Sequence, residues 1–304
     1  ISVPLDGSPL TRDAHQVRLS GDGCVLAFLS HAPDLVANDT NNARDVFVWD
    51  CKTDALEFAS VSSTGELARD SSGDYGVDLS RDGNSVAFTS GATNLVSGDS
   101  NGEIDVFVRD RAKGETVRVS LSSEGAEGNA PSGVPGGVSI SGDGQVVAFH
   151  STATNLVPGD TNGLGDIFVH DRKTKKTTRV NVASDGTQAN GESSLPRISD
   201  DGRFVAFLSL ASNLVPDDDN RCETSPWFAR DACGVDLFVH DRQTGKTTRA
   251  NLSTTGAQME NDAKVAAPEI SGNGKVLAFE STSTTLVPGD ENDVQDVFIR
   301  VLAD

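Results

Sequence analysis

Short apolar runs separated by polar, glycine-containing turns repeat along the whole chain. A turn of the form Leu/Ile-Ser-x-Asp/Asn-Gly precedes one apolar run, and a polar loop then leads to a second run. The first runs read VLAFLS, VAFTS, VVAFHS, FVAFLS and VLAFES, and the second read DVFVWD, DVFVRD, DIFVHD, DLFVHD and DVFIRV. Because these runs are short, rich in Val, Ile, Leu and Phe, and bounded by Gly, Asp and Asn, they predict β-strands and not helices.

This unit of turn, run, loop and run occurs five times. The last glycine of the turn stands at Gly23, Gly83, Gly144, Gly202 and Gly274. Turns containing Asp-Gly or Asn-Gly form tight hairpins. A further short strand follows the second run, most clearly in TVRVSLSSEG and TTRVNVASDG. With the strand before the turn, each copy has four strands, which predicts an all-β, five-bladed β-propeller with four antiparallel strands in each blade.

The propeller is expected to be a single domain spanning residues 1–304, with blades at approximately 19–66, 79–125, 138–186, 196–256 and 268–304. The fifth copy lacks its outermost strand. The initial segment ISVPLDG matches the outer-strand segments VSLSSEG and VNVASDG of other copies. We therefore expect residues 1–7 to complete the fifth blade and to close a monomeric ring, which removes an open sheet edge.

The repeated pattern ISGDGxxVAFxS…DVFVxD resembles the TolB-like, WD-related propeller repeat family of bacterial exported proteins. The resemblance covers essentially the full length. It departs from the family in the first strand, where the family often has an aromatic residue and a proline before Asp-Gly and this chain has Ile/Leu-Ser-Gly. The resemblance implies a propeller fold and an exported location. It says little about the ligand, because propellers host many unrelated functions.

The net charge limits the classes of binding partner that we expect. There are 25 Lys and Arg residues against 45 Asp and Glu residues, giving a net charge of −20. A surface this acidic repels phosphate backbones, so we expect no nucleic-acid partner. It attracts cations. No apolar run approaches the roughly 18 residues of a membrane helix, so no membrane span is expected.

The four cysteines predict two local disulfides. Cys24 opens one predicted strand and Cys51 follows the next, and a hairpin that pairs Phe28 with Phe47 places the two cysteines opposite each other. Cys222 and Cys233 bracket a short segment of the fourth copy. Two such bridges indicate an oxidising compartment, so the protein is expected to be secreted or periplasmic. The alternative is four free, buried thiols.

The strongest chemical signal is an Asp-x-Asn-x-x-x-Asp loop between the second and third strands of each copy. The loop reads DTNNARD, DSNGEID, DTNGLGD and DENDVQD in four copies, and the fourth copy inserts residues before its last aspartate. The residues concerned are Asp39, Asn41 and Asp45; Asp99, Asn101 and Asp105; Asp160, Asn162 and Asp166; Asp218, Asn220 and Asp236; and Asp290, Asn292 and Asp296.

Calcium is the cofactor that this spacing favours. It takes six to eight oxygen ligands from carboxylates, amides, backbone carbonyls and water. Positions one, three and seven of the loop would supply three side chains and position five a backbone carbonyl, so several calcium sites are expected. The loop is not an EF-hand. The alternative is that Asp and Asn only cap turns by hydrogen-bonding to their own backbone.

Catalytic candidates are few. Ser100 matches the G-x-S-x-G string but lies inside an Asp-rich loop, without the strand-to-helix turn that this motif requires. His170 and His240 are expected at exposed ends of the third strand, and His150 at the surface. The insertion of the fourth copy carries Trp227 and Phe228, which would form a ligand-contact surface if a Cys222–Cys233 bridge fixed them, or else cover the small core of the loop itself.

In a propeller, the loops joining second to third strands lie on the same face as the connections between blades. Since loops on a rigid scaffold are where binding residues gather, we expect a calcium-binding scaffold that recognises a protein or polysaccharide on this face. The alternative is a glycoside hydrolase or polysaccharide lyase with acidic residues at the central channel. Only two Trp and one Tyr argue against broad sugar-stacking surfaces.

Overall fold

The structure is a computed structural model that describes residues 13–37, 39–135, 137–218, 234–259, 263–292 and 294–302. Across these ranges it contains nineteen β-strands and no helix. The strands form four four-stranded sheets and one three-stranded sheet, each antiparallel and in chain order. The predicted all-β, five-bladed propeller is therefore confirmed, and the described residues include no helix able to cross a membrane.

The sheets are numbered here as blades one to five. Blade one comprises β1 (Ala14–Leu19), β2 (Val25–Ser30), β3 (Asp45–Asp50) and β4 (Ala55–Phe58). Blade two comprises β5 (Ser72–Leu79), β6 (Ser85–Ser90), β7 (Asp105–Asp110) and β8 (Glu115–Arg118). Blade three comprises β9 (Val138–Ile140), β10 (Val146–Ser151), β11 (Asp166–Asp171) and β12 (Lys176–Arg179). Blade four comprises β13 (Ser193–Ile198), β14 (Phe204–Ser209), β15 (Asp236–Asp241) and β16 (Lys246–Arg249), and blade five comprises β17 (Val265–Ile270), β18 (Val276–Ser281) and β19 (Asp296–Val301).

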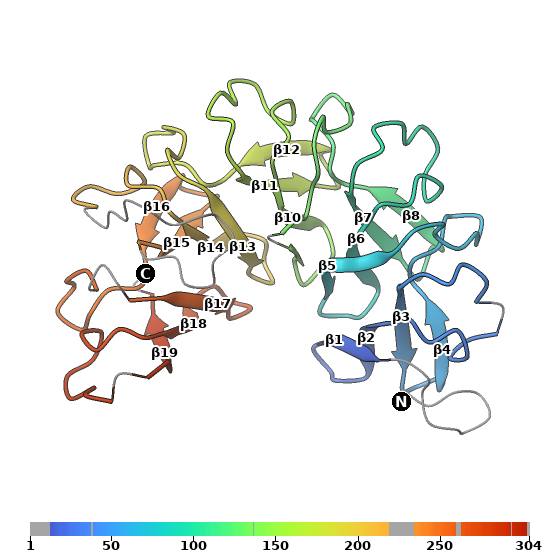
Figure 1. Ribbon diagram of the computed structural model, residues 1–304, viewed down its shortest axis with the longest axis horizontal. Coiled ribbons are helices and arrows are strands. Elements are labelled where there is room, and N and C mark those ends of the chain that lie inside the picture. Colours follow the sequence, from blue (N-terminus) through green and yellow to red (C-terminus); the bar gives the residue numbers. More distant parts are fainter. Residues whose placement is uncertain are drawn as a thin grey trace.

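The blades follow one another around an arc, with blades one and five at its two ends (Figure 1). The first strand of each blade contacts the first strand of the next, from β1 through β5, β9 and β13 to β17. The turns that end these strands are also joined. The N–H of Gly21 donates to the carbonyl of Arg81, Arg81 to Gly142, Gly142 to Asp200, and Asp200 to Gly272. One backbone hydrogen bond thus links each pair of neighbouring blades.

The hydrophobic core lies between blades. In every blade a phenylalanine of the second strand stacks on one of the third, with ring centroids 5.9 Å apart for Phe88 and Phe107. The opposite face of the same sheet carries aliphatic side chains, such as Val106 and Val108. These pack with Phe149 of blade three in one buried cluster. The alternation of aliphatic and aromatic residues along each strand therefore gives every blade two different faces that fit together in series.

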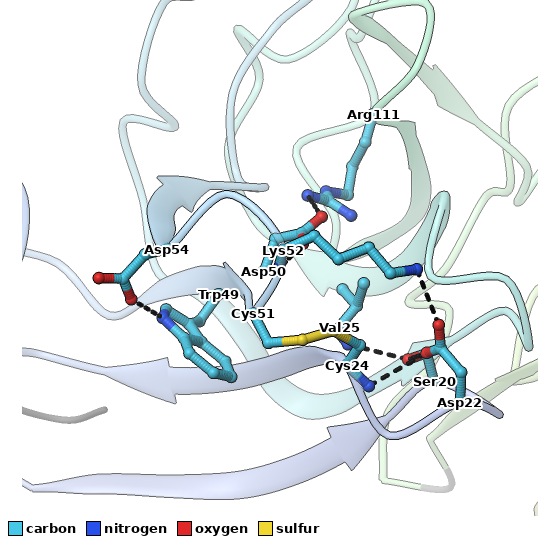
Figure 2. The surroundings of a disulfide bond; sticks show 10 residues. All are labelled: Ser20, Asp22, Cys24, Val25, Trp49, Asp50, Cys51, Lys52, Asp54 and Arg111. Carbon is cyan, nitrogen blue, oxygen red and sulfur yellow. Dashed lines mark hydrogen bonds and ion pairs between the residues drawn. A yellow bond between two sulfur atoms is a disulfide. The ribbon is translucent and has the colours of Figure 1, made fainter.

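The Cys24–Cys51 disulfide is confirmed (Figure 2). Phe28 pairs with Phe47 as predicted, and the same register brings the two cysteine Cα atoms to 5.1 Å. The bridge therefore joins β2 to β3 where the hairpin opens.

Several predictions fall outside the described residues. These are the closing strand at residues 1–7, the Cys222–Cys233 pair, Asn220, and the Trp227 and Phe228 contact surface. Among the described strands, β19 pairs only with β18. Closure by the N-terminal segment therefore stays a prediction.

Candidate cation-binding loops

The last aspartate of each Asp-rich loop is the first residue of the third strand. In blades one to four this carboxylate is buried, with at most 1% of the residue exposed, whereas Asp296 of blade five is partly exposed. A side chain from the segment after the fourth strand donates to its Oδ1 atom. This donor is Ser60 in blade one, at 2.6 Å from Asp45, and an asparagine, Asn181, in blade three.

The asparagine of the loop has the same partners in blades one, two and three. In blade one, Asn41 Nδ2 donates to Asp45 Oδ2 and to the carbonyl of Ala68, both at 2.9 Å. Its Oδ1 accepts the backbone N–H of Ala43 at 3.0 Å. Since Ala68 belongs to the connection leading to blade two, the side chain ties two long loops together. Asn101 and Asn162 repeat this arrangement with Gly128 and Ala189.

An arginine lies between the two aspartates of blade two. Arg118 Nη1 is 3.1 Å from Asp99 Oδ1 and 3.0 Å from Asp105 Oδ2, and all three side chains are at most 7% exposed. The arginine is the last residue of β8, opposite Phe107 of β7. The guanidinium therefore occupies the place between the carboxylates where a metal cation would balance their charge.

Blades three and four contain the same group. Arg179 Nη1 is 3.2 Å from Asp160 and 3.0 Å from Asp166, measured to carboxylate oxygens. In blade four, Arg249 Nη2 is 2.9 Å from Asp218 Oδ2. Sequence reasoning missed these arginines, although the signal was present in the repeated TVR, TTR and TTR of the fourth strands.

Blade one differs, because Phe58 stands opposite Phe47 where blades two to four have the arginine. The two rings pack with centroids 4.9 Å apart. Asp39 Oδ1 is buried and has no hydrogen-bond partner. Burial raises the pKa of Asp45 to about 6, against the hydrogen bonds from Ser60 and Asn41, and the negative charge of Asp39 adds to the rise. Burial also raises the pKa of Asp39.

The remaining predicted ligands lie in blade five. Asp290 and Asp296 are partly exposed, and Asn292 Oδ1 accepts the backbone N–H of Val294 at 3.3 Å. Over the ranges that the structure describes, no three His, Cys, Asp or Glu side chains converge as a metal-binding group. In blade one, Asp39 and Asp45 lie close enough for the charge of one to raise the pKa of the other.

The histidine expectations were wrong. His150, His170 and His240 are all buried, with 0%, 6% and 6% exposure. His170 Nδ1 lies 2.9 Å from the hydroxyl of Thr177 on the neighbouring strand. Burial lowers the pKa of His150 and of His170 to about 4. His170 and His240 lie near the end of the third strand, which the fourth strand and the segment from the preceding blade cover. His150 lies on β10, a strand whose residues are all buried.

Comparison with known proteins supports the fold alone. No family model matches the chain, and neither does any curated protein. The structure is similar to that of a protein assigned as TolB from Agrobacterium tumefaciens, with a TM-score of 0.51 and 13% identity over 96% of this chain and 91% of that one. TolB from Acinetobacter baumannii has a TM-score of 0.49 and 14% identity, over 95% of this chain and 54% of that one. The tricorn protease has a TM-score of 0.50 and 14% identity, over 88% of this chain and 23% of that one.

The class is therefore a β-propeller with a TolB-like fold. This chain spans only 54% of the Acinetobacter baumannii protein and 23% of the tricorn protease.

Proposed function

We propose that the protein is an extracytoplasmic scaffold that binds a partner through rigid loops. The supporting observation is the repeated asparagine bridge. Asn41, Asn101 and Asn162 each join the long loop inside a blade to the connection leading to the next blade. Binding residues gather on loops that a scaffold fixes, and fixed loops lose less conformational freedom on binding. The partly exposed Cys24–Cys51 bridge favours an oxidising compartment, either secreted or periplasmic.

The partner surface that we favour is a groove of about 1160 Å³ along the outer edge of blades one to three. Four cations line it, Lys113, Arg118, Arg172 and Lys175, against two anions, Glu124 and Glu127, together with hydroxyl groups such as those of Ser63 and Ser123. On a protein of net charge −20, a groove with several cations selects an anionic ligand. Hydroxyl and cationic donors suit the carboxylates and hydroxyls of an acidic polysaccharide, which we take as the partner.

A polysaccharide array combined with an activity screen tests this function. The protein should retain acidic polysaccharides without cleaving them, and Lys175→Ala should weaken binding. Lys52→Ala is the matched control, because Lys52 is an exposed lysine that pairs with Asp22 outside the groove. Binding of proteins alone would contradict the choice of partner. Turnover of a polysaccharide would favour the carbohydrate-active enzyme instead of the scaffold.

We further propose that calcium binds the blade-one loop. Two carboxylates in one buried place need a proton or a neighbouring positive charge, and an arginine supplies this charge in blades two to four. In blade one Phe58 supplies none. Asp39 and Asp45 would be the charged ligands, and calcium would complete its coordination with backbone carbonyls and water. Rotation of the Asn41 amide would add its oxygen.

Exchanging the residues opposite the third-strand phenylalanine tests the calcium site. Isothermal titration should find one calcium site in the natural protein, none in Phe58→Arg and an additional one in Arg118→Phe. A hundredfold excess of calcium over its dissociation constant should raise the free energy of unfolding by about 2.7 kcal/mol. Magnesium should substitute poorly, because it retains its water ligands. Absence of binding heat, with melting curves unmoved by chelators, would exclude calcium.

A further inference from the structure

Four-residue turns join the third strand to the fourth in blades one to four, and the turn of blade three is strongly cationic. Residues 171–176 contain one acidic residue against four basic ones, Arg172, Lys173, Lys175 and Lys176, and so carry a net charge of +3. The equivalent segments of blades one, two and four carry net charges of −1, 0 and +1. On a protein of net charge −20, the turn of blade three is therefore a local concentration of positive charge.

Lys175, the last residue of this turn, has a backbone conformation that disfavours lysine. Its φ is +57°, in the left-handed region, and the same position holds Gly114 in blade two, Gly245 in blade four and Asp54 in blade one. Glycine adopts this region freely and aspartate tolerates it, whereas a long side chain such as lysine is strained there. A Cβ atom at Gly245 would have no neighbour within 4 Å, so the strain comes from the backbone and not from crowding. Strain of this kind is retained where function requires it.

Three of the four cations that line the groove between blades one and three already have a partner within the protein. Lys113 forms an ion pair with an aspartate of its own hairpin, with 2.7 Å between nitrogen and oxygen. Arg118 balances the two aspartates of its loop. Arg172 donates to a backbone carbonyl of its own blade at 2.6 Å. These three side chains hold the fold, which leaves Lys175 as the fourth.

The Lys175 side chain is exposed and lines the groove. In the part of the chain that the structure describes, no carboxylate forms an ion pair with it, including Glu124 and Glu127 of the same groove. Glu127 pairs with Arg118 instead. The ammonium group of lysine is a compact, strongly hydrated charge that suits the carboxylate or sulfate groups of a solvated ligand. The Lys175 ammonium is therefore available to such a ligand.

Hydrogen bonds fix the turn that carries Lys175. Asp171 Oδ1 accepts the backbone N–H groups of Lys173 and Thr174, at 3.0 Å and 2.9 Å. The N–H of Arg172 donates to the carbonyl of Gln145 at 2.9 Å, which ties the turn to the neighbouring hairpin. Because the turn is already ordered, a ligand loses little free energy in ordering it. Blade three lies midway along the arc (Figure 1), so this arrangement does not depend on how the ring closes.

We propose that Lys175 is the residue of the groove that contacts the negative charges of the ligand, and that blade three keeps a strained backbone in order to place it. The ligand class is a polysaccharide with a negatively charged group on its sugar units. Lys173 and Lys176 lie in the same exposed segment and extend the contact to further charges. This inference rests on the proposed function, because it assigns recognition of the acidic polysaccharide to one side chain.

Lys175→Gly tests the proposal, because it relieves the backbone and removes the charge in one step. Scanning calorimetry should show a melting temperature higher by about 1–2 °C. Isothermal titration with alginate, a carboxylated polysaccharide, should show a dissociation constant at least about fivefold higher. Lys175→Arg keeps both the charge and the strain, and should match the natural protein in both measurements. Dextran sulfate, titrated in parallel, shows whether sulfate groups serve in place of carboxylates, and neutral dextran should not bind.

Two further variants separate strain from binding. Asp54→Gly is the matched control, because it relieves the same backbone position in blade one, outside the groove, and should leave alginate binding unchanged. Gly245→Lys is the reverse exchange in blade four, and should lower the melting temperature by about as much as Lys175→Gly raises it.

The outcomes distinguish this inference from the proposed function. If the natural protein binds alginate or dextran sulfate and Lys175→Gly binds as tightly, the inference fails and the proposed function stands. If the natural protein binds neither polysaccharide, both fail. A Lys175→Gly variant that melts at a lower temperature, or a Gly245→Lys variant as stable as the natural protein, would show that the turn carries no strain and would overturn the inference as well. The same holds if Asp54→Gly weakens binding as much as Lys175→Gly does.

Discussion

Blade one and blades two and three share one fold and one loop motif, but different groups secure their hairpins. Blades two and three each use two arginines, one following the third strand and one ending the fourth. These are Arg111 and Arg118 in blade two, and Arg172 and Arg179 in blade three. Blade one has Cys51 and Phe58 at the corresponding positions.

Only one of these two replacements keeps the function of the arginine. Arg111 donates to the carbonyl of Gly83 at 2.8 Å and so holds its own hairpin turn, and in blade one the Cys24–Cys51 bridge holds the same place covalently. Phe58 fills the space of the second arginine without its charge. The comparison teaches that packing and charge balance are separable in this repeat, and that blade one has retained the packing alone.

The largest effect is expected from removing an arginine that balances the charge of two buried carboxylates. Arg179→Met in blade three leaves Asp160 and Asp166 buried without their cation, so the free energy of unfolding in urea should fall by about 3–5 kcal/mol. Arg69→Met is the matched control, because the Arg69–Glu66 pair is exposed and should contribute less than about 1 kcal/mol. Equal losses of unfolding free energy from the two substitutions would contradict a special role of the buried arginine in balancing charge.

The second effect concerns the Cys24–Cys51 disulfide of blade one. Replacing Cys24 and Cys51 by serine should lower the free energy of unfolding by about 2–4 kcal/mol, because a constraint on the unfolded chain is lost. The pair Cys24→Asn and Cys51→Arg installs the residues that blade two has at these positions, Asn84 and Arg111, and should recover part of the loss. Chemical denaturation of all three proteins decides this. If the Asn/Arg variant is no more stable than the double serine variant, the arginine does not replace the disulfide in holding the hairpin.

The fold and the first disulfide could be predicted because both depend on local pattern. Asp-Gly turns and short alternating strands define the hairpins, and the Phe28–Phe47 register then fixes Cys24 opposite Cys51. The arginines depend on the register of a third hairpin, between third and fourth strands. Arg118 is 13 residues from Asp105, and nothing in the loop motif points to it. For the same reason the sequence did not show that the aspartates of the loop pair with an arginine in blades two and three.

The predictions for the histidines were wrong for a different reason. His170 is the next-to-last residue of β11, and strand ends are usually exposed, but here its Nδ1 atom lies 2.9 Å from the hydroxyl of Thr177 on the adjacent strand. Burial of this kind depends on the packing of neighbouring blades, which no single repeat encodes. The converse holds for Leu19 of β1 and Ile299 of β19, which are exposed although the sequences of their strands are those of buried strands.

The smallest effect is the pH dependence of blade one in calcium-free buffer. The folded pKa of Asp45 is raised to about 6, above the value of 3.8 in the unfolded chain, so the folded protein binds more protons between these values. Stability from this group is therefore full below about pH 4 and is lost as the pH rises through 6.

The variant Phe58→Arg isolates this contribution. An arginine opposite Phe47 would lie beside Asp45 as Arg118 lies beside Asp105, and would favour the ionised carboxylate. The buried histidines give the opposite slope, since their lowered pKa values cost stability as the pH falls below about 6.5, but they are the same in both proteins. The difference in unfolding free energy between Phe58→Arg and the natural protein should thus grow as the pH rises from 4 to 7. A difference that is constant across this range would mean that Asp45 titrates normally and that blade one needs no cation.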